Sequence, residues 1–179
     1  MRTFSTAIAA TTILVGLSTG AGAQSAEQAM AAAVAASEKY QDVNVALAAG
    51  FVKDPSGACV SAGAEGLPPE WGAMGVHYLN MAKLQITGGE PLGGEGIHTD
   101  FNDPAILMYE PQADGSMVLV AIENLVFQAA WSAAGNAEPP SFAGVVWDAM
   151  ADDPATEASE SHGFAPHFDR HFWAFRDNP

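Results

Sequence analysis

The sequence predicts an α+β fold in which one N-terminal helix packs on an antiparallel β-sheet or small barrel. Three observations indicate this class: an Ala-rich segment near the start, alternating apolar segments later on, and a short turn ending in Asp114-Gly115 between two of them. We find no second core and no linker, so we expect one domain. A cupin-like β-barrel is the alternative, because strands with inward His and Glu suit it, although its early His-x-His pair is missing.

Residues 1–23 have the pattern of a secretory signal peptide. Arg2 supplies positive charge, an uncharged run extends from Phe4 to Leu17, and the small residues Ala21–Ala23 precede a cleavage site. The run is too short for a good membrane span. We therefore expect a periplasmic or secreted protein with a single globular domain at residues 24–179, and no membrane insertion once the signal peptide is removed.

The chain is strongly acidic. It has 6 Lys and Arg residues against 21 Asp and Glu, a net charge of −15, which loss of Arg2 would change to −16. Such a surface repels nucleic acid and attracts cations. We expect no nucleic-acid partner, and a well-solvated surface by itself explains the charge.

Cys59 is the sole cysteine, so the chain cannot form an internal disulfide. The fold must then rest on its hydrophobic core, with or without a bound ion. We expect Cys59 to be a buried small apolar residue, and pairing with another chain is the alternative.

The first half of the domain predicts one helix and one strand. Ser25 can cap a helix that runs to about Ala49, and Gly50 is a natural C-terminal stop. Met74–Asn80 has the pattern of a first strand. Thr87–Pro104 is rich in Gly and predicts a long loop, which could be a lid or binding loop or a surface excursion.

Ala105–Glu110 and Ser116–Phe127 predict two further strands, joined as an antiparallel hairpin. The second is the most strongly apolar segment of the domain, and Glu123 interrupts it. On a strand, Glu123 shares a face with Leu125 and other apolar residues. Burial of an unpaired carboxylate is costly, so Glu123 must be paired, bound to an ion, protonated or turned outward.

The C-terminal segment Pro166–Arg176 concentrates histidines, aromatic residues and charges near the end of the chain. Its aromatic content favours a strand, on which alternate side chains share one face. That face would carry His167, Asp169, His171, Trp173 and Phe175.

Spacing along this strand limits which side chains can share an ion. Residues two apart lie ~6.6 Å apart between α-carbons, as Asp169 does from each histidine, but His167 and His171 would be ~13 Å apart. We expect at most one of the two histidines at an ion and favour His171, because His167 is near the start of the strand. The alternative is a half-exposed edge strand in which Asp169 pairs with Arg170 or Arg176.

His77 lies in the middle of the first predicted strand, where a single histidine is usually a hydrogen-bonded core residue. A His and a Glu that are both out of place on sheet faces are most simply explained by each other. We therefore predict a polar cluster of His77, Glu123 and His171, with Asp169 and His167 as further candidate ligands. Imidazole and carboxylate bind zinc, iron, manganese or copper, so the cluster could hold a divalent transition metal. A metal-free polar cluster stays open.

Other site chemistries have little support in the sequence. Cys59 has no neighbouring His, and there is no Gly-x-Ser-x-Gly motif for a nucleophilic Ser. The Gly-Gly pairs lack the Lys-Ser or strand-to-helix context of phosphate-binding loops. No catalytic residue is therefore assigned from the sequence.

A set of motifs is spread over most of the chain after residue 23. They are Tyr-Gln-Asp-Val at 40–43, Ala-Ala-Gly-Phe at 48–51, Met-Gly-Val-His-Tyr-Leu-Asn at 74–80, Leu-Met-Tyr-Glu at 107–110, His-Phe-Asp-Arg-His-Phe-Trp at 167–173 and Arg-Asp-Asn-Pro at 176–179. Together they resemble a family of secreted bacterial and fungal proteins to which no activity has been assigned. The Met-Gly-x-His-Tyr and His-x-x-x-His-x-Trp elements are the specific ones.

The resemblance implies an exported single domain in which four residues belong to family motifs: His77, Glu110, Glu123 and His171. It also implies a final Cys after the Asn-Pro element that could pair with the position of Cys59. The sequence ends at Pro179 without that Cys, so we expect no such disulfide here.

Two functional hypotheses follow. In the first, the cluster binds a divalent metal or a small-molecule ligand, with Glu123 or His171 as proton carrier and His77 as a ligand or orienting residue if the site is catalytic. An organic ligand would lie against the aromatic face of Trp173. In the second, the protein is a non-enzymatic envelope protein in which the cluster only fixes the core.

Overall fold

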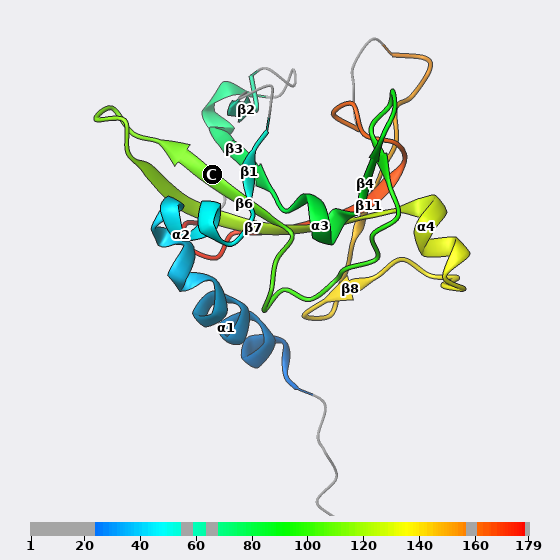
Figure 1. Cartoon of the computed structure of the whole chain (residues 1–179), viewed down its shortest axis with the longest axis horizontal. Helices are drawn as coiled ribbons and strands as arrows, with labels where there is room; N and C mark the ends of the chain where they lie inside the picture. The colour runs from blue at the N-terminus through cyan, green and yellow to red at the C-terminus, as the bar shows by residue number, and fades with distance from the viewer. Residues whose placement is uncertain (1–23, 55–58, 64–67, 157–160, 178–179) are drawn as a thin grey trace, which may run out of the picture.

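The computed structural model describes residues 24–54, 59–63, 68–156 and 161–177, and the predicted signal peptide lies outside them (Figure 1). A large antiparallel sheet forms the framework, and the N-terminal helical segment contributes to the core on one of its faces. The mixed α+β class is confirmed. The sheet is open, with β1 and β10 at its two edges, so the closed cupin-like barrel is wrong.

Within the described residues, seven strands form the main sheet, in the order β1-β3-β6-β7-β11-β10 with β2 also paired to β3. Neighbouring strands are antiparallel throughout. The predicted first strand is β3, and the predicted hairpin is the pair β6–β7. The bounds are β1 Val52–Lys53, β2 Cys59–Ser61, β3 Ala73–Leu79, β6 Ile106–Pro111, β7 Met117–Phe127, β10 Asp148–Met150 and β11 His167–Phe172.

Shorter elements surround this sheet. They are the helices η2 Pro69–Trp71, α3 Met81–Leu84 and α4 Gln128–Ala133, and the two-stranded sheets β4 Ile86–Gly88 with β5 Gly93–Gly94 and β8 Ser141–Phe142 with β9 Val145–Val146. No helix in the described part of the chain is long and apolar enough to cross a membrane.

The single helix expected from Ser25 to about Ala49 is instead three short segments: α1 Ala26–Ser37, η1 Glu38–Gln41 and α2 Val43–Ala48. Ser25 does cap the first, as predicted. The helix is interrupted where the buried Tyr109 hydroxyl donates to the backbone oxygen of Tyr40, 2.6 Å away. Asp42 then caps α2 by accepting from the backbone N–H of Asn44 at 2.9 Å.

Apolar side chains lie on both faces of the sheet. One face packs with the helical segment, which contributes Ala33, Tyr40 and Ala46 to its core. The rings of Tyr78 and Tyr109 meet edge to face there, with centroids 4.9 Å apart. The other face carries two smaller clusters, one of Leu79, Leu84, Ala105, Ile106, Leu125 and Phe127, and one of Met108, Val120 and Ala121.

The segment Thr87–Pro104, expected as a loop, is more ordered than predicted. Most of β4 and all of β5 lie in its first half, and a β-carbon at Gly94 would collide with the ring of Phe127. Only a residue without a side chain allows this close approach, so Gly94 fixes the hairpin against β7.

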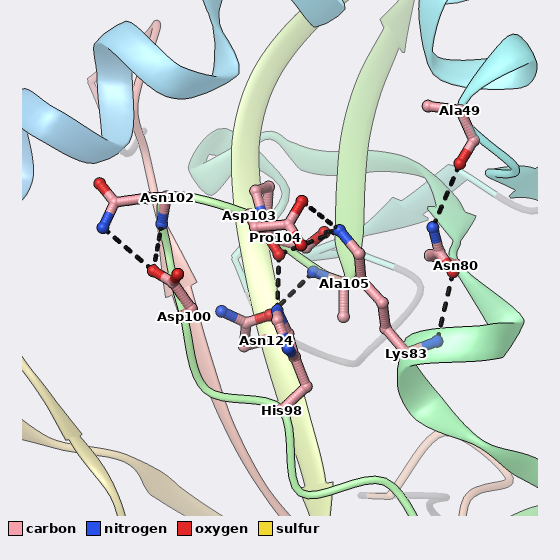
Figure 2. Close-up of polar contacts among 10 residues, drawn as sticks. All are labelled: Ala49, Asn80, Lys83, His98, Asp100, Asn102, Asp103, Pro104, Ala105 and Asn124. Atoms are coloured by element: carbon pink, nitrogen blue, oxygen red, sulfur yellow. Dashed lines mark hydrogen bonds and ion pairs between the residues drawn. The ribbon is translucent and has the colours of Figure 1, made fainter.

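Side-chain contacts hold the end of the same segment, as Figure 2 shows. The Lys83 ammonium donates to Asp103 Oδ1 at 2.6 Å and to the backbone oxygens of Asp103 and Pro104. The His98 Nε2 lies 2.6 Å from the backbone oxygen of Asp103. Asn124, buried on β7, accepts from the backbone N–H of Ala105 at 2.8 Å. The segment is therefore tied to the sheet next to β6.

Cys59 lies exposed on β2, so the expectation of a buried small apolar residue is wrong. In the part of the chain that the structure describes, β2 is a short strand paired along one edge of β3, and Cys59 on this strand is exposed to solvent.

Candidate metal centre

The three residues predicted to cluster, His77, Glu123 and His171, lie on one face of the main sheet. Glu123 on β7 is directly opposite His171 on β11. His77 lies on β3, where it pairs with Met108 of β6, and Met108 pairs in turn with Ala121 of β7. Ala121 is two residues before Glu123, so His77 lies one row away on the same face.

The three side chains meet around one oxygen atom. Oε2 of Glu123 lies 3.6 Å from Nε2 of His77 and 3.4 Å from Nε2 of His171. One ligand atom from each residue lies within 4.8 Å of the others. Donor atoms bound at ~2.0–2.2 Å to one ion, at tetrahedral angles, lie about 3.4 Å apart. The two nitrogen-to-oxygen separations therefore fit a shared metal ion.

Glu123 is a buried carboxyl group that its surroundings leave unsatisfied. Its side chain is 5% exposed, and Oε2 has no hydrogen-bond partner among the described residues. The two imidazole nitrogens beside it stand at 3.4 and 3.6 Å, longer than good hydrogen bonds. An unsatisfied buried oxygen destabilises the fold. A cation between the three side chains would remove that cost.

Burial shifts the protonation equilibria of the group. It raises the pKa of Glu123 to about 8 and lowers the pKa of His77 to about 4, where the neighbouring His171 adds to the effect. Burial also lowers the pKa of His171. Without an ion, all three side chains are therefore neutral near pH 7. Neutral imidazole is the form that binds a metal, and a bound cation would favour loss of the Glu123 proton.

The other two candidate ligands, Asp169 and His167, lie on β11 outside this group. Asp169 is buried, and its Oδ2 lies 3.8 Å from Nδ1 of His171, whose other ring nitrogen faces Glu123. Burial, followed by the charge of Glu123, raises the pKa of Asp169 to about 7. Nδ1 of His167 lies 3.0 Å from the backbone oxygen of Ala165. The structure thus brings together three of the five candidates.

The alternative prediction, in which Asp169 forms a salt bridge with Arg170 or Arg176, is wrong. Arg170 pairs with Asp148 at 3.3 Å, across the strand pair β10–β11. Arg176 pairs with Glu110 at 2.6 Å. Both cations have exposed or half-exposed carboxylate partners elsewhere, so the buried Asp169 is left beside His171.

Apolar side chains border the group: the sequence predicted Trp173 on the same face as His171, but it did not identify Met108 and Ala121 as neighbours of the group. Met108 and Ala121 are fully buried, and Trp173 packs against their cluster. Met108 and Ala121 lie beside the group because β6 is between β3 and β7, and local sequence patterns do not show this order of strands. The side chains of His77 and His171 are 16% and 26% exposed, so the group is reachable from solvent.

No protein-family model, curated protein or solved structure matches this chain. The resemblance based on the motifs at residues 74–80 and 167–173 therefore stays a prediction. The geometry of His77, Glu123 and His171 is the feature of this chain that points to a function.

Proposed function

We propose that His77, Glu123 and His171 bind one divalent transition-metal ion in an exported protein, and that the ion keeps coordination positions for a small-molecule ligand. The observation that carries the proposal is the buried Oε2 of Glu123, which has no hydrogen-bond partner among the described residues and lies 3.4 and 3.6 Å from two imidazole nitrogens. An ion shared by these atoms would give each of them a partner.

The donor set supports a reactive rather than a purely structural metal centre. Two imidazoles and one carboxylate form the ligand set of several catalytic zinc sites and of non-haem iron(II) sites. Structural zinc sites generally use four protein ligands, with Cys among them. Within the described residues the candidate group has three ligands and no Cys, and Cys59 is exposed on β2. Open positions on the ion follow from this count.

Charge and exposure indicate the kind of molecule that would fill those positions. Two neutral imidazoles and one carboxylate leave a divalent ion with net positive charge, which favours a small anion or a neutral oxygen donor. The ion, when bound, would act as a Lewis acid toward such a molecule. The partly exposed rings of His77 and His171 give access, while Met108 and Trp173 keep one side apolar.

A metal-free cluster that only fixes the core is the competing explanation. Such a cluster needs hydrogen bonds between the Glu123 carboxyl group and the two imidazoles. Oε2 of Glu123 makes none within the described part of the chain, although both Nε2 atoms are close to it. The metal-free cluster therefore leaves the buried oxygen unexplained, and the metal centre accounts for it.

Export is the part of the proposal supported by sequence alone. The positive start, apolar run and small residues of positions 1–23 have the pattern of a signal peptide, and the family resemblance points the same way. We infer that the metal centre works in the periplasm or outside the cell.

A competition titration with a chromophoric chelator tests the metal centre. The wild type should bind about one equivalent of Zn²⁺ or Co²⁺. The nearly isosteric Glu123→Gln should weaken binding by more than the about 10–100-fold that loss of an outer partner costs. Glu95→Gln, which changes an exposed carboxylate, is the control and should behave as wild type. A wild type that binds no more tightly than Glu123→Gln would overturn the proposal.

A second measurement tests the open positions. Azide added to the Co²⁺-loaded wild type should change the visible d–d absorption of the ion, because an exogenous anion can enter its coordination sphere. A spectrum that azide leaves unchanged at any concentration would contradict the open site, while leaving the metal site itself in place.

A further inference from the structure

We propose that Asp169 is a positioning residue, whose carboxylate holds Nδ1–H of His171 so that Nε2 of the same ring is free to bind the metal. The inference rests on the proposed metal centre. It gives Asp169 a role different from the direct ligand that the sequence suggested.

The two nitrogens of the His171 ring face two different carboxyl groups. Nε2 lies 3.4 Å from Oε2 of Glu123, and Nδ1 lies 3.8 Å from Oδ2 of Asp169. In metal sites, a ligating histidine almost always donates its other ring N–H to a carboxylate, a backbone oxygen or water. That bond fixes the tautomer and the orientation of the ring. His171 has this arrangement, with Asp169 at Nδ1 and the candidate metal position beside Glu123 at Nε2.

The strand β11 creates the arrangement. Asp169 and His171 are two residues apart, so their side chains share a face, and each is opposite a residue of β7. The 3.8 Å separation is longer than a hydrogen bond. A small rotation of the His171 ring, as its Nε2 meets an ion, would close it, since such bonds often tighten only when the site is loaded.

The surroundings of Asp169 favour this role over others. The residue is 5% exposed, and the two cations considered from the sequence as its partners, Arg170 and Arg176, pair with other carboxylates. Within the described residues, the ion pair of Asp169 is with His171. The candidate ligand group, defined by atoms within 4.8 Å of one another, does not include Asp169. Its carboxylate thus lies behind His171 and outside the ligand set.

Two substitutions test the role, with Zn²⁺ as the probe. Asp169→Asn keeps size and one oxygen but loses charge, and Asp169→Leu removes both oxygens. We expect Zn²⁺ affinity to fall about 10–100-fold in Asp169→Leu and less in Asp169→Asn. Asp148→Asn is the matched control: Asp148 lies directly opposite Asp169 on β10, but its carboxylate is exposed and bonds to Arg170. It should bind Zn²⁺ as the wild type does.

The tautomer of His171 gives a readout that a merely structural role would not move. In the wild type, ¹⁵N NMR of labelled histidine should show His171 protonated at Nδ1 and metal-bound at Nε2. In Asp169→Leu, the Nδ1–H signal should lose its hydrogen-bonded shift. Circular dichroism checks that each variant is folded. If Asp169→Leu does not fold, the isosteric Asp169→Asn is used for the same NMR and Zn²⁺ measurements.

The outcomes separate the two proposals. A wild type without Zn²⁺ affinity overturns the metal centre and, with it, this inference. A wild type that binds Zn²⁺, together with Asp169 variants of equal affinity and unchanged His171 signals, overturns the positioning role alone. Binding of the metal through Nδ1 of His171 would overturn it as well.

Discussion

Glu123 and His171 are directly opposite each other on the antiparallel strands β7 and β11, with Oε2 and Nε2 3.4 Å apart. Side chains in such a pair have β-carbons ~4.5–5.5 Å apart, so backbone register alone brings these two groups together. His77 reaches the same oxygen from β3, across β6. A site built on paired strands is held more rigidly than one on loops, which suits a preorganised metal centre.

The stability of the metal-free protein should fall as pH rises from 7 to 8. Burial raises the pKa of Glu123 from its usual 4.5 to about 8, so the folded state holds a proton that the unfolded state has released. The stabilisation that this proton contributes is fully present below pH 4.5 and is lost as pH rises through 8. His77, with its pKa lowered to about 4, is neutral when folded and mostly neutral when unfolded in this window.

Urea denaturation in the presence of a chelator measures this effect. The wild type should lose roughly 1 kcal/mol between pH 7 and 8, and Glu123→Gln should lose much less. We choose the range from pH 7 to 8 because the pKa of Asp169 is raised to about 7. Most of the stability change that comes from the Asp169 proton therefore occurs below pH 7. An equal decrease in the free energy of unfolding of the two proteins between pH 7 and 8 would contradict a buried, protonated Glu123.

Metal affinity should instead increase with pH. The proton on Glu123 competes with the ion up to its pKa of about 8. The apparent Zn²⁺ affinity should therefore rise by up to about tenfold per pH unit between pH 6 and 8, and level off above it. Calorimetry in buffers of different ionisation enthalpy should show about one proton released per ion at pH 7. Binding without proton release would contradict the protonated carboxyl group.

The strands and the unusual polar residues could be predicted because they follow from local pattern. Side-chain alternation with period two locates β3, β6 and β7, and a carboxylate inside the apolar run of β7 stands out. The strand spacing also separates His167 from His171. The residues in each of these cases are close in sequence, where backbone geometry fixes which side chains share a face.

The relations between distant elements could not be predicted in the same way. Strand order places β6 between β3 and β7, so His77 reaches Glu123 over Met108 rather than from a neighbouring strand. The N-terminal helix is interrupted where Tyr109, far along the chain, donates to the Tyr40 carbonyl. Both outcomes depend on tertiary packing, which overrides local propensity.

Gly75→Ala should destabilise the protein and weaken the metal centre. A β-carbon at Gly75 would lie 2.6 Å from the backbone oxygen of Tyr109, and the residue has a φ of +99°. The change would push β3 away from β6, two residues before His77. We expect a loss of more than about 2 kcal/mol.

Gly88→Ala is the matched control, because Gly88 has a φ of +84° with open space around its β-carbon position. It should cost only about 1 kcal/mol from backbone strain. Thermal unfolding and Zn²⁺ titration of both variants measure the difference. Equal losses would show that the contact with Tyr109 relaxes without cost.

Lys83→Met should loosen the segment that precedes β6. The Lys83 ammonium makes three bonds to Asp103 and Pro104, the shortest at 2.6 Å. Because the Asp103 side chain is about half exposed, we expect a loss of only about 1 kcal/mol. Amide hydrogen exchange at residues 97–103 should become faster. Lys53→Met, at an exposed position on β1, is the control, and equal exchange in both variants would contradict this role for Lys83.

The most direct test of the account is the metal content of the protein, purified without chelator from the cells that produce it and extensively dialysed. The account predicts about one equivalent of a transition metal, lost in His171→Ala and kept in His98→Gln, whose imidazole lies in the segment before β6 and outside the candidate group. A wild type that carries no metal, and shows no thermal shift with zinc, manganese, iron or copper, would contradict the metal centre.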